Sequence, residues 1–148
     1  MSDFAPETRF SPVLSVYNEA SISKVERVVF LSGKLYYDLA KTAETRGLAE
    51  RVVFVRLEEL CPFPFKEVAS IVKKLSSAKQ FLWVQEEARN QGAWSHVEQR
   101  FSSVMTSLGM GKTVEYRGRP VSAVPAIGTG RLHTLEHASV LDQAFEGL

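Results

Sequence analysis

The chain has 148 residues, a length that suits one ordinary domain with a substantial hydrophobic core. Hydrophobic residues make up 45% of it and charged residues 24%, which is typical of a folded globular protein and argues against general disorder. The 18 basic and 17 acidic residues nearly cancel to a formal charge of +1, which argues against a bulk electrostatic interaction with nucleic acid or an anionic membrane.

The first 25 residues are more polar than the rest of the chain. We predict that residues 1–25 form an extended arm, which lies on the domain or joins it to another, and that residues 26–148 form the domain itself. The apolar residues expected to anchor the arm are Phe4, Phe10, Val13 and Leu14. The segment has no basic region ahead of an apolar stretch, so it is not typical of a signal peptide. No apolar run in the chain approaches the roughly 20 residues that a membrane helix needs.

From residue 26 onward, short apolar runs alternate with segments whose apolar residues recur at helical spacing. We predict strands at residues 26–31, 51–57, 80–85 and 113–117. The first predicted helix covers residues 34–45, and Pro64 is placed to open the second. The apolar faces of the other predicted helices are Phe65, Val68, Val72 and Leu75; Trp94, Val97, Phe101, Val104, Met105 and Leu108; and Leu135, Ala138, Leu141 and Phe145.

This alternation predicts an α/β fold, specifically an open three-layer structure with a mostly parallel sheet and helices on both faces. The runs VVFL, VVFV and FLWV are almost entirely apolar, as expected for strands that are covered on both sides. Ligands of such sheets usually bind at the carboxyl ends of the strands. The corresponding segments here are residues 32–34, 58–64, 85–92 and 118–130.

Two of these segments contain isolated reactive side chains. The Ser32-Gly33-Lys34 turn is not a P-loop, because no glycine stands five positions before Gly33 and a leucine follows Lys34. We interpret it as a tight turn from strand to helix, with anion contact by Lys34 as the alternative. Cys61, the single cysteine, excludes an internal disulfide and a multi-cysteine metal site and favours a reducing compartment. We expect it to be a buried thiol beside a proline turn.

Residues 133–137 match the pattern H-x-x-E-H, in which two histidines four apart on a helix share a metal and the glutamate acts as base. A zinc hydrolase that uses His133, Glu136 and His137 is therefore one alternative function. A surface helix start explains the residues better. In that interpretation Thr134 caps the helix, and the helix dipole favours Glu136.

Residues 85–92 form a polar cluster directly after an apolar strand. We predict that this cluster contacts another subunit, another domain or a ligand, with a solvated loop as the alternative. Trp94 is expected to be an interface anchor or, equally, a core residue. The predicted interface residues are Gln85, Glu86, Glu87, Asn90, Gln91 and Trp94. Farther along, Arg117 and Arg119 flank a glycine. We interpret them as a solvated strand end, with contact to phosphate or carboxylate groups as the alternative. No complete catalytic set can be assembled from the sequence.

Taken in order, the segments TRFSPVL, VVFLSGKLYYDL, RLEELCPFPF, WVQEEARNQGAW and PAIGTGRLHTLEH resemble a known family. They are similar to the C-terminal domain of the decarboxylating first component of 2-oxoglutarate dehydrogenase and its 2-oxoadipate-type relatives. The similarity covers nearly the whole chain. QEEARNQGAW is its most specific part, and ELCPFP followed by GRPVSAVPAIGTG leans toward the 2-oxoadipate type.

The resemblance implies a transketolase C-terminal-like fold and a domain that is not catalytic alone. In that family thiamine diphosphate and magnesium lie between two other domains, which supply a Gly-Asp-Gly metal motif that this chain lacks. The parent reaction implied is oxidative decarboxylation of 2-oxoglutarate, as in the tricarboxylic acid cycle, or of 2-oxoadipate, with transfer to a lipoyl group. The cofactor supplies the electron sink of that reaction. A stand-alone interaction subunit derived from such a domain remains the alternative.

The resemblance also implies partners and a location. The partners are the remaining domains of the enzyme, a second copy in a homodimer, and the lipoyl acyltransferase component of the complex. The location is the mitochondrial matrix in a eukaryote or the cytoplasm in a bacterium. Some relatives bind a regulatory acetyl-CoA or AMP through this domain. The candidate residues here for such an effector are Lys34, Arg56 and Lys66.

Overall fold

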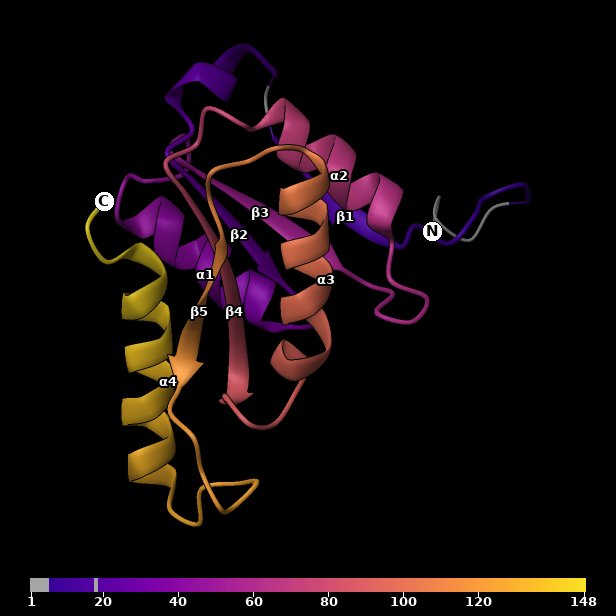
Figure 1. Ribbon diagram of the computed structural model, residues 1–148. Helices are drawn as coiled ribbons and strands as arrows, with labels where there is room; N and C mark the ends of the chain where they lie inside the picture. Colours follow the sequence, from indigo (N-terminus) through magenta and orange to yellow (C-terminus); the bar gives the residue numbers. More distant parts are fainter. Residues whose placement is uncertain (1–5, 18) are drawn as a thin grey trace.

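The protein is represented by a computed structural model, which describes residues 6–17 and 19–148 (Figure 1). Its strands are β1 (Val13–Ser15), β2 (Arg27–Leu31), β3 (Val52–Leu57), β4 (Gln80–Ala88) and β5 (Val114–Arg119). Its helices are the short 3₁₀ helix η2 (Glu19–Lys24) and the α-helices α1 (Leu35–Thr45), α2 (Phe65–Lys74), α3 (Trp94–Ser107) and α4 (Gly130–Phe145). The predicted alternation of strands and helices is confirmed, with boundaries within three residues of the expected ones except at the start of α4.

The five strands form one sheet in the order β1-β3-β2-β4-β5. The pairs β2–β3, β2–β4 and β4–β5 are parallel, and β1 runs antiparallel to β3 at the edge. The predicted class, an open mostly parallel sheet with helices on both faces, is therefore confirmed, and it is consistent with the transketolase C-terminal-like fold that the resemblance implied.

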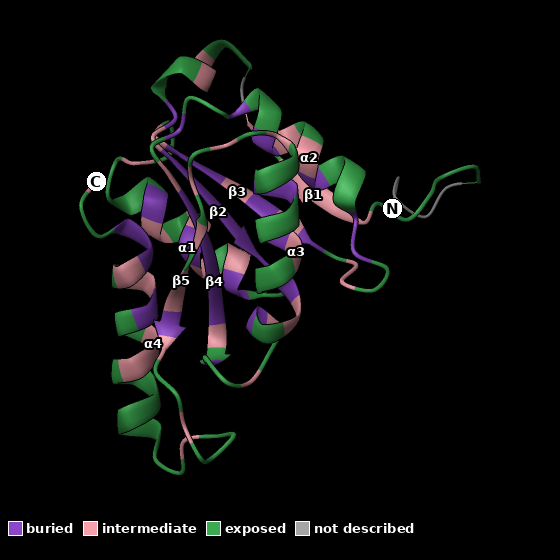
Figure 2. Ribbon diagram, viewed as in Figure 1, coloured by how far each residue is buried: buried purple, intermediate pink, exposed green. Residues whose placement is uncertain are grey.

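Two hydrophobic cores lie on opposite faces of the sheet. Along β2, Val28 and Phe30 face α2 and α3, whereas Val29 and Leu31 face α1 and α4. This alternation follows from the strand period of two, and it explains why β2 is apolar at every position from Val28 to Leu31. Figure 2 shows the strands as a buried layer between helices whose outer faces are exposed. Among the described residues, no helix combines the length and apolarity that crossing a membrane requires.

The N-terminal segment contributes directly to this sheet. Val13 pairs with Leu57 in β3 and packs against the core, and the Pro12 carbonyl accepts hydrogen bonds from the backbone N–H groups of Glu58 and Glu59. Phe10, expected to be an anchor, is instead 71% exposed. Phe4 lies outside the described residues.

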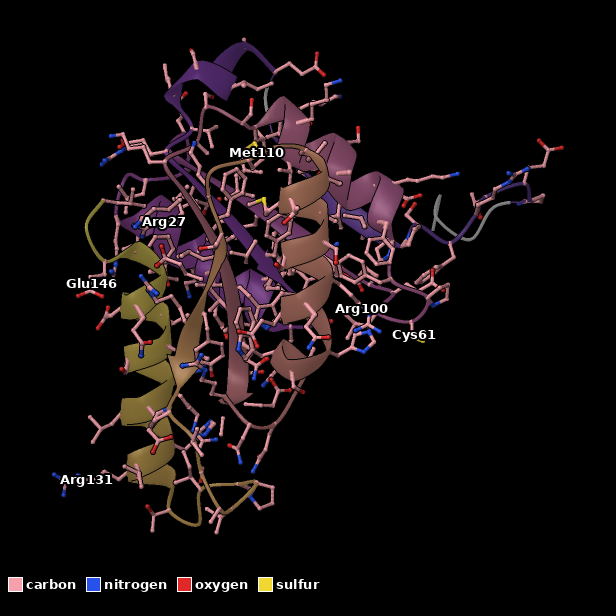
Figure 3. The ribbon with its side chains drawn as sticks, viewed as in Figure 1. Arg27, Cys61, Arg100, Met110, Arg131 and Glu146 are labelled. Atoms are coloured by element: carbon pink, nitrogen blue, oxygen red, sulfur yellow. The ribbon has the colours of Figure 1, made fainter. Side chains whose placement is uncertain are left out.

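The last turn of α4 is tied to the first residue of β2. Arg27 is only 2% exposed, and its guanidinium donates hydrogen bonds to the carbonyls of Ala144 (2.8 Å) and Glu146 (2.7 Å) and to the side-chain oxygen of Gln80. Burial lowers the pKa of Arg27 below its ordinary value, with a smaller contribution from Arg117. Figure 3 shows Arg27 beside Glu146 at this end of α4. A buried cation here satisfies carbonyls that a helix C-terminus leaves without partners.

The residue before Arg27 forms an ion-pair cluster at the amino edge of the sheet. Hydrogen bonds from Arg51 and from Lys79 (2.6 Å) lower the pKa of Glu26 to about 2. A carboxylate whose pKa is lowered by folding stabilises the folded state at pH values above its unfolded pKa, and this contribution is lost as the pH falls toward the folded pKa.

We therefore expect the Glu26→Gln variant to be less stable than the wild type at neutral pH, with the difference shrinking between about pH 4.5 and about pH 2. Urea unfolding midpoints measured from pH 7 to pH 2 test this expectation. Glu44→Gln, on an exposed part of α1, serves as the control. A difference between wild type and Glu26→Gln that does not change over this pH range would contradict the assignment.

Candidate functional site

The chain reverses its winding direction at β2 and β4, which lie side by side in the sheet. The connection that leaves β2 leads to α1 on one face, and the connection that leaves β4 leads to α3 on the opposite face. Diverging connections of this kind leave a crevice at the carboxyl ends of the two strands, which is the usual ligand position in open α/β sheets. Here the crevice has a volume of about 530 Å³.

The crevice is lined by three of the four segments that the sequence proposed as ligand positions. Ser32, Gly33 and Lys34 come from the first segment, Leu60 and Cys61 from the second, and Gln85, Glu86, Glu87 and Gly92 from the third. Trp83, Ala93 and His96 complete the lining. The predicted tight turn after β2 is confirmed, because Gly33 has φ +74°, a conformation that glycine adopts without the strain that a side chain would add.

Two reactive side chains of the crevice differ from the sequence expectations. Cys61 is exposed at the crevice rather than buried, although Leu60 and Phe63 of the same connection between β3 and α2 pack on the core. His96 was not singled out as a site residue. Its Nε2 atom lies 2.8 Å from the Leu60 carbonyl, which joins the first turn of α3 to the β3–α2 connection. Its place one turn beyond the 85–92 segment is the signal that could have identified it.

A β-bulge places Glu86 and Glu87 at the rim of the crevice. Gln85 pairs with Gly118 and Ala88 pairs with Arg119, so β4 has two extra residues, Glu86 and Glu87, between positions that pair with consecutive residues of β5. A bulge re-aims the side chains of the inserted residues, and these two carboxylates project from the sheet edge. The strand predicted to end at residue 85 therefore ends at Ala88, so its expected boundary was wrong by three residues.

The partner strand explains why this bulge has glycine opposite it. A Cβ atom at Gly118 would lie 2.6 Å from the Tyr116 hydroxyl and 2.8 Å from the Gln85 carbonyl. The same close packing surrounds Tyr116, whose hydroxyl donates a hydrogen bond to the Arg119 carbonyl at 2.8 Å. Burial raises the pKa of Tyr116 to about 12. Because Gly118 and Arg119 pair with β4, they belong to β5 and not to the following loop, where they were expected.

Gln85 organises the segment that follows β4. Its side-chain oxygen accepts hydrogen bonds from Trp83 Nε1 and from the backbone N–H of Trp94, both at 2.9 Å. Its amide nitrogen donates to the carbonyls of Ala88 (3.0 Å) and Gln91 (2.8 Å). Because Trp94 is the first residue of α3, Gln85 satisfies an N–H group that the helix start would otherwise leave free.

The predicted interface residues therefore divide into two groups. Gln85 and Trp94 are buried within the chain, both at 5% exposure, so their side chains serve its own core rather than an external surface. Asn90 and Gln91 bind the loop between β5 and α4 instead. The Asn90 side chain exchanges two hydrogen bonds with the Ser122 backbone (2.9 and 3.0 Å), and Gln91 reaches the carbonyls of Ser122 and Val124. Glu86 and Glu87 keep carboxylates at the rim, and contact of this rim with another subunit stays a prediction.

A second hollow of about 310 Å³ lies between the end of β4, the loop that joins β5 to α4, and α4 itself. Its polar lining consists of Glu86, Glu87, Arg119, His133, Glu136 and His137. Arg119 forms an ion pair with Glu136, and Arg117 pairs with Glu115 at 2.9 Å. Both arginines thus meet carboxylates, one of the two outcomes expected for them, and the carboxylates belong to the same chain.

The geometry of α4 does not support a metal centre on the H-x-x-E-H residues. Glu136 is held by Arg119, and His137 approaches Asp38 and Glu86 through opposite ring nitrogens. Among the described residues, no group of three or more histidine, cysteine, aspartate or glutamate side chains could hold a metal ion.

Two further expectations about α4 were wrong. The helix begins at Gly130, so Thr134 is not its cap. The Thr134 hydroxyl donates instead to the Gly130 carbonyl one turn earlier. Leu135 is 59% exposed, because the first half of α4 extends past the sheet (Figure 1), and the buried face is Val140, Ala144 and Phe145.

The three candidate effector-binding cations lie in different surroundings. Lys34 lines the crevice. Arg56 lies at the neighbouring end of β3, where its guanidinium is 4.6 Å from the Tyr36 ring centroid and 3.4 Å from a Glu58 carboxylate oxygen. Lys66 is exposed in the first turn of α2. Neither Arg56 nor Lys66 belongs to the lining of the crevice, so the structure places one of the three cations there.

Known proteins similar to this chain fall in one family. The family model described as "2-oxoglutarate dehydrogenase C-terminal" matches residues 1–145. The chain is 38% identical over 145 residues to the "Probable 2-oxoadipate dehydrogenase complex component E1 homolog" of Caenorhabditis elegans, covering 98% of this chain and 15% of that protein. It is 40% identical over 148 residues to the "2-oxoglutarate dehydrogenase E1 component" of Cupriavidus necator, covering 100% of this chain and 15% of the relative.

A vertebrate relative gives the same result. The chain is 40% identical over 148 residues to the "2-oxoadipate dehydrogenase complex component E1" of Danio rerio, with 98% of this chain and 15% of the relative covered. The chain therefore spans about 15% of the length of these relatives. With a family match over almost every residue and the expected α/β fold, the chain belongs to the family of 2-oxoglutarate dehydrogenase E1 C-terminal domains.

Proposed function

We propose that this chain is a non-catalytic assembly domain of a thiamine diphosphate-dependent 2-oxo acid dehydrogenase. The parent enzyme would decarboxylate 2-oxoglutarate or 2-oxoadipate and pass the acyl group to a lipoyl group. The observation that carries this proposal is full-length similarity to one end region of E1 components, of which the chain covers about 15%. The partners would be the rest of the enzyme, a second copy and the lipoyl acyltransferase, in a mitochondrial matrix or a bacterial cytoplasm.

The described residues do not fit the cofactor of that reaction. Thiamine diphosphate is held through a magnesium ion, which takes oxygen ligands in a near-octahedral arrangement. No suitable group of three or more acidic or histidine side chains exists among residues 6–17 and 19–148, and the crevice places Lys34 beside Glu86 instead. We therefore assign the cofactor and its chemistry to the other regions of the parent enzyme.

An activity measurement tests the non-catalytic role. We expect the purified chain, supplied with thiamine diphosphate and magnesium, to give no oxidation of 2-oxoglutarate or 2-oxoadipate above the background without protein. An artificial electron acceptor makes this assay independent of the other components of the complex. An intact E1 component from a relative serves as the positive control. Turnover by the isolated chain would falsify the proposal.

The crevice supports a second part of the proposal, the binding of an anionic effector of the acetyl-CoA or AMP type. Lys34 offers an ammonium group, and α3 begins at the crevice beside Ala93, where the helix dipole favours phosphate. Arg56 and Lys66 lie outside the lining, so we assign the principal cationic contact to Lys34.

Calorimetry tests this second part. We expect acetyl-CoA or AMP to bind the chain, and Lys34→Met to weaken binding about five-fold, in line with the modest energy of an exposed ion pair. Lys41→Met, on the exposed side of α1, is the matched control and should leave the affinity unchanged. Equal affinities of wild type and Lys34→Met would remove Lys34 from the site.

A further inference from the structure

One carboxylate oxygen of Glu86 lies between two nitrogen atoms, which belong to Lys34 and His137 and line different hollows. Glu86 lines both the crevice and the second hollow beside α4. Its Oε1 atom is 3.7 Å from Lys34 Nζ on the crevice side and 3.8 Å from His137 Nδ1 on the α4 side. Both distances exceed that of a hydrogen bond, so Glu86 is hydrogen-bonded to neither group. A small rotation of its side chain would form a hydrogen bond to one of them.

The other ring nitrogen of His137 faces a second acid. Its Nε2 atom lies 3.3 Å from Asp38 Oδ2 on α1, and the His133 ring stacks against the His137 ring at a centroid distance of 6.2 Å. The remaining charged groups around this hollow are Glu87 on β4 and the Arg119–Glu136 ion pair between β5 and α4. The imidazole is thus placed between carboxylates from two elements, Asp38 on α1 and Glu86 on β4.

We propose that Glu86 is an exchangeable carboxylate that pairs with His137 when this imidazole is protonated and with Lys34 when it is neutral. The protonation state of His137 on α4 then determines whether Lys34 is paired with Glu86 or free to bind an anion in the crevice. The effect on the anion rests on the proposed function of the crevice, whereas the exchange of Glu86 does not. Because coupling between two sites is reciprocal, an anion on Lys34 also favours proton uptake by His137.

The size of the effect follows from the exposure of the groups. Glu86 and His137 side chains are 31% and 27% exposed, so solvent screens their interaction in part. Histidine is the side chain that proteins most often use for charge switching near physiological pH. We expect the affinity of the crevice for a divalent anion to rise about three-fold between pH 8 and pH 6.

Carbon-13 NMR of the 148-residue chain tests the exchange without any ligand. With ¹³C-labelled glutamate, the Glu86 carboxylate resonance should shift with the same midpoint as the His137 ring signals. The shift should vanish in His137→Asn and in His137→Gln, two variants that guard against a local packing defect, and it should remain in the control His133→Asn. A Glu86 signal that ignores the His137 titration, or that still follows pH in both His137 variants, overturns the proposal.

Sulfate binding tests the consequence for the crevice, because the charge of sulfate is constant between pH 6 and pH 8. We expect binding that is tighter at pH 6 in the wild type, equally tight at both pH values in Glu86→Gln, and equally weak at both in His137→Asn. His96 also lines the crevice, so His96→Asn must retain the dependence. If the dependence vanishes with His96 instead, the assignment to His137 is wrong. If sulfate binds none of the variants, the anion site of the proposed function fails, and the NMR result alone decides the exchange.

Discussion

Replacing Gln85 with leucine is expected to lower the free energy of unfolding by about 2–4 kcal/mol. Leucine has a similar size but leaves the Trp83 Nε1–H and the Trp94 N–H without an acceptor and the Ala88 and Gln91 carbonyls without a donor. Buried polar groups that lose their partners cost about 1–3 kcal/mol each, and some of these groups will regain water when the segment loosens. Urea unfolding at neutral pH measures the loss.

Two further variants separate the hydrogen bonds from the volume of the Gln85 side chain. Gln85→Glu keeps the acceptor but turns a second oxygen toward the Ala88 and Gln91 carbonyls, so we expect it to be destabilised as well. Gln99→Leu makes the same chemical change as Gln85→Leu on the exposed face of α3 and should alter stability by less than about 0.5 kcal/mol. If Gln85→Leu were as stable as Gln99→Leu, Gln85 would not be the organising residue of the segment.

Replacing Arg27 with methionine is the second change with a large expected effect, a loss of about 2–4 kcal/mol in the free energy of unfolding. Methionine fills most of the same space, but it cannot donate to the Ala144 and Glu146 carbonyls or to Gln80. Arg27→Lys restores a charge without the planar fork of donors, so its stability should lie between those of the wild type and Arg27→Met.

The control for Arg27 comes from the other end of α4. Arg131 is exposed in the first turn of that helix and points away from the protein in Figure 3, so Arg131→Met should leave stability nearly unchanged. Hydrogen exchange of the last turn of α4 provides a local readout, because amides there should lose protection in Arg27→Met before those of β2. Retained protection of the last turn in Arg27→Met would contradict the role assigned to the guanidinium.

The local pattern of the sequence was sufficient to predict the layers of this fold. Val28 to Leu31 are apolar without a break because both faces of β2 are covered, and this property is visible in the sequence. The bulge at Glu86 and Glu87 was not predictable in the same way, since it depends on how β4 pairs with β5. The exposure of Leu135 likewise depends on where the sheet ends beneath α4, which helical periodicity does not encode.

The candidate site was predictable to the level of segments. The turn that carries Lys34 was expected at the carboxyl end of a strand, and it lines the crevice. The burial of Trp94 was one of the two outcomes expected for it. The inward orientation of Gln85 was missed, because a polar residue next to a charged run resembles a solvated loop in the sequence. The geometry of His137 between Asp38 and Glu86 joins three elements and therefore requires the tertiary structure.

The contact between Arg27 and the last turn of α4 has a consequence for the order in which this chain acquires its structure. The hydrogen bonds to Ala144 and Glu146 join positions 117 and 119 residues apart. During synthesis, the guanidinium at the start of the central strand has no such acceptors until residues 144–146 have left the ribosome. Contacts of this separation slow folding, so the central strand reaches its final surroundings only after α4 has been made, although it is translated before that helix.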